Sequence, residues 1–258
     1  MAFCELHLFS RALGLQTTVY AIIPQNATTG EIGVEKAETK GKFKCLYLLH
    51  GLSDDHTIWL RRTSIERYAE AHGIAVVMPF GDRSFYSDMV HGGKYYSYIA
   101  KELPLLMRNF FNISEKREDN FIAGLSMGGY GALKIALKNP ECYAAAAGLS
   151  SVADIMMRKE TFSVPLKAVY GENIDIPEDD DLFYLAKKTD KCEIKPRIFM
   201  GVGTKDGLYA ENIRLKECFE NLSYDYTFRE SEGTHSWVFW DEYIKYVFEW
   251  LKKDINKA

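Results

Sequence analysis

Five residues constrain this chain more than any others: Gly124-Leu125-Ser126-Met127-Gly128, which form a G-x-S-x-G pattern. The stretch before them, 120–123 (NFIA), is short and mostly apolar and predicts a strand, whereas 130–138 (YGALKIALK) predicts a helix. A serine between a strand and a helix lies on a sharp turn, and the small residues beside it allow a strained backbone. This context favours a nucleophilic role for Ser126 over the alternative, a turn that merely joins two elements.

The rest of the chain alternates between predicted strands and predicted helices. Unbroken apolar runs such as Cys45–Leu49 are typical of parallel strands that are buried on both faces. A length of 258 residues, 47% of them hydrophobic, suits one large core, so we expect a single domain over 1–258. Together with the serine turn, this alternation predicts an α/β-hydrolase fold with a mostly parallel central sheet flanked by helices. The predicted strands are 17–24, 45–49, 74–79, 120–123, 143–149, 197–202 and 224–230, the predicted helices are 63–72, 96–111, 130–138, 210–222 and 237–255, and 25–42 is predicted to be a hairpin or loop.

Residues 150–195 interrupt the alternation, because they separate two predicted strands by more residues than a simple crossover needs. We expect a small insertion of short helices that caps the cleft. Its acidic run, Glu178–Asp181, lacks the glycine and the terminal glutamate of a calcium-binding loop. We therefore predict a solvated loop or a helix start there, and no metal site.

Charge and cysteine content restrict the partners and the compartment. With 32 basic and 36 acidic residues the net charge is −4. The sequence therefore lacks the excess of basic residues that is typical of proteins that bind nucleic acid or an anionic membrane. Five cysteines without a C-x-x-C spacing predict buried free thiols in a reducing compartment. The first 14 residues lack a long apolar segment, and no run is long enough to span a membrane, so we expect a cytoplasmic protein without a signal peptide.

A serine hydroxyl needs a base, because it is scarcely ionised at neutral pH. In hydrolases of this fold the order along the chain is serine, acid, histidine, and His235 is the only histidine after Ser126. Asp206 follows a predicted strand in a glycine-containing turn and is the best-placed acid, with the task of orienting the imidazole. An ordinary Asp-Gly turn is the alternative for Asp206. The competing acids lie in the insertion, away from a strand end: Asp154, Asp175 and 179–181.

Two backbone N–H groups must stabilise the oxyanion that forms when such a serine attacks a carbonyl. One should belong to Met127, directly after the nucleophile, and the other to Leu52, just after a buried predicted strand. His91-Gly92-Gly93 looks more like the HGGG motif of lipases, but it follows no strand closely. We therefore prefer the loop at His50-Gly51, and we interpret His50 itself as a structural residue that holds this loop.

Residues around this cleft are candidates for binding the substrate. We single out Trp59, Gly51 and Trp237, which lie close in sequence to the oxyanion loop or to the predicted base. For each aromatic residue, packing in the core is the alternative interpretation.

These motifs together resemble the esterase D / S-formylglutathione hydrolase family of α/β-hydrolases, and within it the bacterial tributyrin esterases. The resemblance covers most of the chain and rests on 46–61, 76–88, 95–104, 121–137, 203–215 and 233–244. It implies a serine carboxylesterase that acts on small-molecule esters with short acyl chains and has no cofactor. Some relatives instead hydrolyse acetyl or feruloyl groups on plant polysaccharide, or S-formylglutathione, and these alternatives stay open. Acyl transfer by the same residues also stays open. The oligomeric state stays open too, with a homo-oligomer as one alternative.

Overall fold

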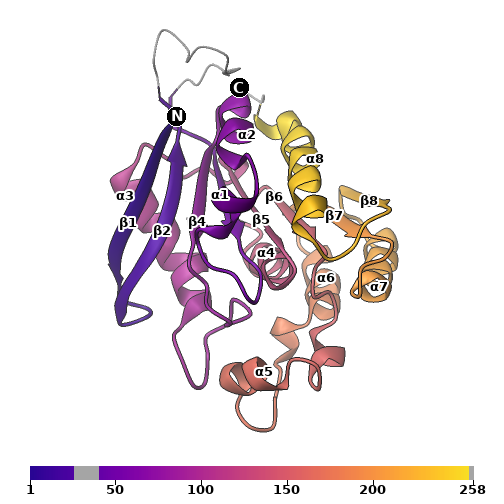
Figure 1. Cartoon of the computed structure of the whole chain (residues 1–258). Coiled ribbons are helices and arrows are strands. Elements are labelled where there is room, and N and C mark those ends of the chain that lie inside the picture. The colour runs from indigo at the N-terminus through magenta and orange to yellow at the C-terminus, as the bar shows by residue number, and fades with distance from the viewer. Residues whose placement is uncertain (26–40, 256–258) are drawn as a thin grey trace.

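The computed structural model describes residues 1–25 and 41–255, so most of the predicted loop 25–42 lies outside the described residues. In this part of the chain eight strands form one sheet in the order β1-β2-β4-β3-β5-β6-β7-β8 (Figure 1). The strands are β1 (Ala2–Ser10), β2 (Leu15–Ile23), β3 (Cys45–Leu49), β4 (Ala75–Pro79), β5 (Asn120–Leu125), β6 (Ala145–Leu149), β7 (Arg197–Gly203) and β8 (Tyr226–Ser231).

Six of these strands, β3 to β8, run parallel, and the β1–β2 hairpin joins them antiparallel through β2 and β4. Every residue of β3, β4, β5 and β6 is buried, as the unbroken apolar runs predict. β6 is a strand although it is rich in alanine, because it lies between β5 and β7 and its small side chains allow α4 to pack closely on it. The predicted α/β-hydrolase fold is therefore confirmed.

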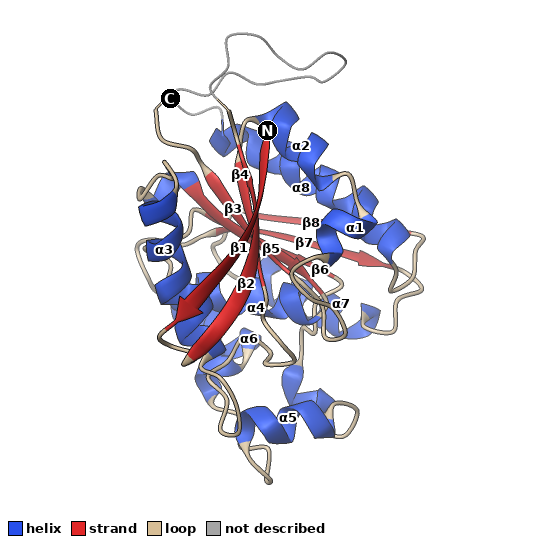
Figure 2. Cartoon of the chain, turned by 60° about the vertical axis from the view of Figure 1, so that its left-hand side comes forward, coloured by secondary structure: helices blue, strands red, loops and turns tan. Residues whose placement is uncertain are grey.

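Helices cover both faces of the sheet (Figure 2). One core lies beneath α1, α2 and α8, and the other lies beneath α3, α4, α6 and α7. The helices are α1 (Ile58–Arg62), α2 (Ile65–His72), α3 (Leu103–Phe110), α4 (Met127–Lys138), α5 (Ser163–Tyr170), α6 (Leu182–Asp190), α7 (Tyr209–Glu220) and α8 (Trp237–Ile255). None of the helices in the described ranges combines the length and the apolar character that a membrane span requires.

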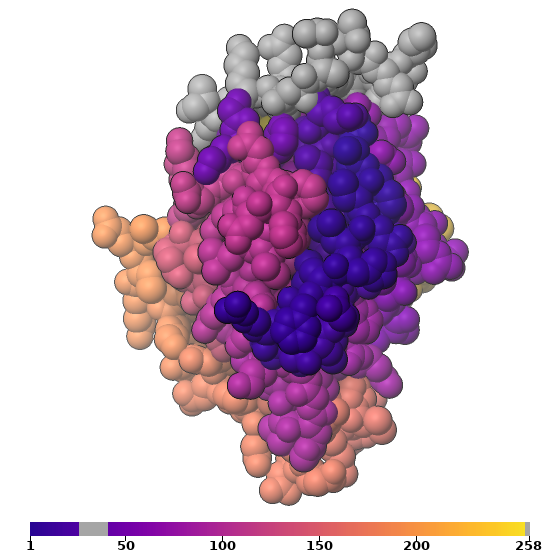
Figure 3. Space-filling model, turned by 90° about the vertical axis from the view of Figure 1, so that its left-hand side faces the viewer, coloured from indigo at the N-terminus to yellow at the C-terminus, as the bar shows by residue number. Residues whose placement is uncertain are grey.

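Strand β1 is an element that the sequence analysis missed. Its apolar side chains alternate in the period-two pattern of a half-buried strand, with Cys4, Leu6 and Leu8 facing inward. Figure 3 shows the β1–β2 hairpin lying beside the segment of α3 on one face of the molecule. The Glu102 carboxylate fixes this arrangement, because it accepts hydrogen bonds from the Ser10 hydroxyl and from two N–H groups of the hairpin turn.

The predicted helix 96–111 is present, and the structure shows how it accommodates Pro104. A π-helical stretch, Ser97–Glu102, leads into α3, and Pro104 lies in the first turn of α3. Proline has no N–H to donate and its ring crowds the carbonyl four residues earlier, and Pro104 lies at the point where the hydrogen-bond pattern changes from π-helical to α-helical.

Only the first part of the insertion 150–195 borders the cleft. Val152, Arg158, Thr161 and Phe162 line the cavity beside Ser126, whereas α6 packs against α4 as the crossover helix of the sheet. Short helices are present as predicted: two 3₁₀ turns, 155–158 and 178–180, together with α5 and α6.

Two expectations from the sequence need correction: that the acidic run 178–181 is solvated, and that the cysteines are buried. Asp181 caps the start of α6 by accepting a hydrogen bond from the Phe183 N–H, but its neighbour Asp180 is buried rather than solvated, because two lysines of α4 pair with it. The cysteines are free, yet only Cys45 is buried. Cys142 and Cys192 are exposed, since they lie in polar surface turns rather than in the apolar core.

Candidate active site

Ser126 lies at the turn between β5 and α4 with a strained backbone. Its φ of 53° and ψ of −117° are unusual for a residue other than glycine, and such conformations cost about 1–3 kcal/mol each. The surrounding chain fixes this conformation: the Ser126 N–H donates to the Leu149 carbonyl at 2.8 Å, and the Ser126 carbonyl accepts from the N–H groups of Tyr130 and Val152. The hydroxyl is thereby held at the carboxyl end of the parallel strands.

The glycines at either end of the motif are required by close contacts of the backbone. A Cβ atom on Gly124 would lie 2.3 Å from the Gly128 carbonyl oxygen, and one on Gly128 would lie 2.5 Å from the carbonyl oxygens of Leu49 and His50. Both clashes are with backbone atoms, which cannot rotate away as a flexible side chain can. The glycines at both ends of the G-x-S-x-G motif therefore allow β5, α4 and the end of β3 to approach one another closely.

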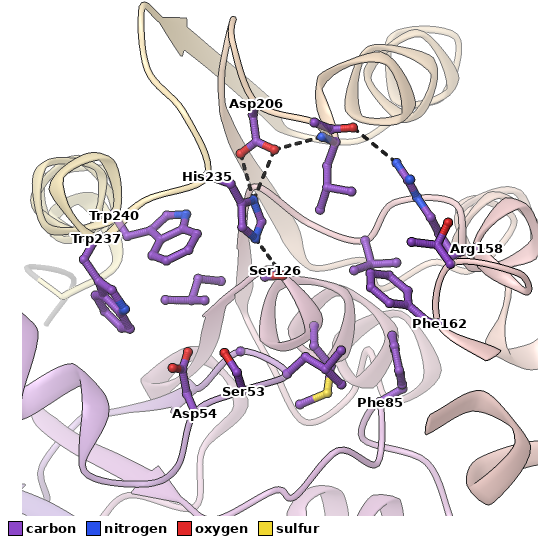
Figure 4. A pocket seen from close by; sticks show the side chains of 18 residues that line it. Ser53, Asp54, Phe85, Ser126, Arg158, Phe162, Asp206, His235, Trp237 and Trp240 are labelled. Atoms are coloured by element: carbon purple, nitrogen blue, oxygen red, sulfur yellow. Dashed lines mark hydrogen bonds and ion pairs between the residues drawn. The ribbon is translucent and has the colours of Figure 1, made fainter. Parts of the chain in front are cut away.

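His235 and Asp206 complete a chain of hydrogen bonds that begins at Ser126 (Figure 4). The Nδ1 atom of His235 lies 2.9 Å from Asp206 Oδ2 and 3.1 Å from Oδ1, and its Nε2 atom lies 3.0 Å from Ser126 Oγ. A carboxylate can only accept, so Nδ1–H donates to Asp206 and Nε2 accepts from the serine hydroxyl. This tautomer leaves Nε2 ready to take the serine proton.

Asp206 follows β7 and remains ionised in spite of its burial. Burial raises the pKa of its carboxyl, but the hydrogen bonds from His235 and from the Leu208 N–H outweigh that effect and hold the pKa below its usual value. Close packing of the end of β7 against the loop that carries His235 brings Asp206 to its partner: a Cβ atom on Gly203 would lie 2.3 Å from the Gly233 carbonyl oxygen, which also accepts from the Lys205 N–H. Glycines on both sides of this contact therefore allow Asp206 and His235 to meet.

The imidazole of His235 rests against an aromatic side chain that the sequence analysis did not identify. The Trp240 ring lies 4.8 Å from the His235 ring in an edge-to-face arrangement. Its Nε1–H donates to the Ser150 hydroxyl at 3.1 Å, which fixes the indole. Trp240 lies one helical turn after Trp237 on α8, which directly follows the loop that carries His235, and this i, i+3 spacing was a signal in the sequence.

Ser126 opens into a cavity of about 400 Å³. The predicted residues Gly51, Leu52, Met127 and Trp237 line it together with Ser126, Asp206 and His235. In Figure 4 Ser53, Asp54 and Trp237 lie on one side of Ser126, and Phe85, Arg158 and Phe162 lie on the other. The residues that line the cavity but were not predicted are Ser53, Asp54, Phe85, Leu125, Val152, Arg158, Thr161, Phe162, Gly207, Leu208 and Trp240.

Some of these unpredicted residues could have been identified from the sequence. Phe85 follows β4 and Asp54 follows β3, and the carboxyl ends of parallel strands meet at one edge of a sheet. Burial raises the pKa of the half-buried Asp54 carboxyl, against the lowering effect of the Gly51 N–H. Arg158 and Phe162 gave no such signal, because the path of the insertion determines where they lie.

His50 holds the loop after β3, in line with the structural role predicted for it from the sequence. The His50 Nδ1–H donates to the Gly51 carbonyl at 2.7 Å, and Nε2 accepts from the Gly81 N–H at 2.8 Å. Burial lowers the pKa of His50 to about 4, so the ring is neutral and holds these two partners. The alternative motif lies elsewhere: the His91 N–H bonds to the Ala168 carbonyl at α5, and His91 does not line the cavity.

Trp59 does not line the cavity, and its assignment as a substrate-binding residue is wrong. Its side chain is only 1% exposed, and Nε1–H donates to the Leu49 carbonyl at 3.0 Å. Trp237 lies between it and the cavity, with the two rings 5.2 Å apart. Trp59 therefore supports the end of β3 and the packing of Trp237.

Comparison with known proteins identifies the family. The model of the Esterase family matches residues 10–247, which is most of the chain. This chain belongs to the esterase family of α/β-hydrolases. It is 33% identical to an acetyl esterase of Caldicellulosiruptor saccharolyticus over 98% of this chain and 99% of the relative.

Solved structures of two Staphylococcus aureus proteins are similar over nearly the whole esterase. The fluorophosphonate-binding serine hydrolase FphF has a TM-score of 0.86 and 33% identity, with 99% of both chains covered. The S-formylglutathione hydrolase FrmB has a TM-score of 0.84 and 34% identity, with 97% of this chain and 98% of that chain covered. The protein is accordingly a carboxylic ester hydrolase of the esterase D / S-formylglutathione hydrolase type.

Proposed function

We propose that this esterase hydrolyses short-chain acyl esters through a triad of Ser126, His235 and Asp206. The observation that carries the proposal is the unbroken set of hydrogen bonds from Ser126 Oγ through His235 to Asp206. Attack by Ser126 Oγ on the ester carbonyl passes the serine proton to His235 Nε2. The imidazolium then gives this proton to the leaving alcohol as the bond to that alcohol breaks, which leaves an acyl-serine.

Deacylation repeats these steps with water. His235 Nε2 takes a proton from water as the hydroxide attacks the acyl carbonyl, and it returns the proton to Ser126 as the acid leaves. Throughout, Asp206 stays ionised and stabilises the imidazolium. The N–H groups of Met127 and Leu52 bind the oxyanion. Met127 is the first residue of α4, where the N–H groups have no intrahelical partner, and Leu52 lines the same cavity.

The cavity supports a small, largely apolar acyl group. Phe85, Val152 and Phe162 form part of its wall, and a volume of about 400 Å³ is near the lower end for ligand pockets. The names of the relatives do not separate the candidate substrates, since an acetyl esterase and an S-formylglutathione hydrolase are equally similar to this chain. A panel of p-nitrophenyl esters from acetate to octanoate, with methyl ferulate, acetylated xylan and S-formylglutathione, ranks them by kcat/KM.

The test of the mechanism is Ser126→Ala, with Ser53→Ala as the matched control because it removes a second serine hydroxyl from the same cavity. We expect S126A to lose hydrolysis of p-nitrophenyl butyrate and labelling by a fluorophosphonate probe, because the nucleophile is gone. S53A, which keeps the nucleophile, should still be labelled by the probe and should retain measurable hydrolysis. Turnover by S126A at the wild-type rate contradicts the proposal.

A further inference from the structure

Lys134 is a charged side chain in a place where charge is costly. It lies on α4, two turns after the nucleophile, and its side chain is fully buried. Burial lowers the pKa of the Lys134 ammonium to about 8, so the group is still protonated at neutral pH. An apolar side chain of similar length would fill this space without the desolvation cost. The triad uses neither Lys134 nor the groups to which it is bound.

The Lys134 ammonium connects three segments of the chain. It donates to the Phe85 carbonyl at 3.0 Å and to the Ser87 hydroxyl at 2.5 Å, both in the loop after β4, and it lies 3.4 Å from Asp180 Oδ2 in the insertion. Asp180 also accepts from the hydroxyls of Ser87 and Tyr170. Helix α4, the loop after β4 and the insertion therefore share one buried ionic cluster.

The loop that Lys134 holds is strained where it meets the cavity. Phe85 and Tyr86 have φ values of 49° and 52°, a region that costs a side-chain-bearing residue about 1–2 kcal/mol. The Tyr86 ring packs closely against α4, since a Cβ atom on Gly131 would lie 2.3 Å from it. The bond from Lys134 to the Phe85 carbonyl fixes the first of the two strained residues.

Phe85 forms the end of the cavity that lies away from Trp237 (Figure 4). Its ring is 5.7 Å from that of Phe162 and 6.1 Å from that of Tyr130. A relaxed loop would withdraw this ring and lengthen the cavity. The position of the Phe85 ring at this end of the cavity therefore depends on the hydrogen bond from the Lys134 ammonium.

We propose that Lys134 is a positioning residue that, through the Phe85 carbonyl, limits the size of the substrate group this end of the cavity accepts. The inference deepens the proposed esterase function and rests on it. Lys138 is a natural control, because it pairs with the same Asp180 carboxylate at 3.1 Å but makes no bond to the loop after β4.

The test compares Lys134→Met, Lys138→Met, Phe85→Ala and the double variant K134M/F85A. For each we would measure the melting temperature and kcat/KM along two series: p-nitrophenyl esters from acetate to octanoate, and alkyl acetates from methyl to hexyl. K134M should move the optimum toward longer chains in one series, with a change on the order of tenfold in the ratio of long to short substrates. F85A should shift the same series and K138M should not. In the F85A background, K134M should add nothing, because its effect acts through Phe85.

The charge-balanced variant K134M/D180N keeps the test usable if K134M alone does not fold, since it removes the buried charge of Asp180 together with that of Lys134. An unmoved profile in a folded variant overturns the proposal, as does an equal shift in K138M or a full further shift from K134M in the F85A background. The proposed function fails separately: in that case the wild-type protein itself hydrolyses no ester of either series.

Discussion

Replacing Trp59 by phenylalanine separates a structural role from a substrate-binding role. The change removes the indole N–H that donates to the Leu49 carbonyl at 3.0 Å, at the last residue of β3. Leaving a buried carbonyl without this partner costs about 1–3 kcal/mol, and the smaller ring adds a cavity term, so we expect a total of about 2–4 kcal/mol. For a chain of this size each kcal/mol lowers the melting temperature by about 2–4 °C, which gives a fall of roughly 5–15 °C.

Activity should respond much less than stability. Because Trp59 does not line the cavity, kcat/KM for p-nitrophenyl butyrate at 25 °C should stay within about threefold of the wild-type value. Trp237→Phe is the control, since Trp237 lines the cavity: we expect a changed KM and a smaller thermal effect. Calorimetry and steady-state kinetics on both variants decide the matter. A loss of kcat/KM beyond about tenfold at an unchanged melting temperature in W59F would refute the assignment of Trp59 to the structural framework.

Three further predictions concern Asp206, Gly128 and Asp180. Asp206→Asn should lower kcat by about 10³–10⁴-fold with little change in KM, because the amide no longer fixes the Nδ1–H tautomer of His235; stopped-flow or steady-state kinetics measure this. Gly128→Ala should destabilise the fold by roughly 1–3 kcal/mol in urea unfolding and also lower kcat, because the new Cβ atom would displace the end of β3 next to Leu52. The pKa of Asp180 is well below its usual range: burial raises it, but Lys134 and Lys138 outweigh burial. Its contribution to stability is therefore present above about pH 4 and lost as the pH falls below that value, so the melting temperature of D180N should depend less on pH between 7 and 3 than that of the wild type.

Much of the fold could be predicted because its strands are buried on both faces. A strand such as β3 has no polar face, so its apolar run marks both its presence and its end. Parallel strands then bring their carboxyl ends to one edge, and for this reason sequence reasoning placed Ser126, Asp206 and His235 near one another. Strand β1 was missed although its period-two pattern is present, because the alternating pattern of a half-exposed edge strand gives a weaker signal than an unbroken buried run.

Trp59 and Arg158 show where such reasoning stops. Trp59 lies near the site in sequence, and Arg158 lies near it in space. Which of them faces the cavity depends on how α1 and the insertion pack, and no local sequence pattern determines either packing. An indole ring suits a core and a substrate pocket equally well. Its N–H partner, the carbonyl of Leu49, decides the role here, and that partner is visible only in three dimensions.

The buried ion pair of Lys134 and Asp180 shows that two weak signals can be combined. Residues 127–137 of α4 are all buried, so a lysine within that run cannot reach water and needs a counter-charge from elsewhere in the chain. The acidic run 178–181, taken alone, is typical of a solvated helix start, and Asp181 does cap α6. A helix buried along its length with a lysine on it predicts that some acidic residue is buried too, and a run of four acids is the richest source. The charge balance of the core, rather than the local pattern, thus identifies which part of the insertion must pack against α4.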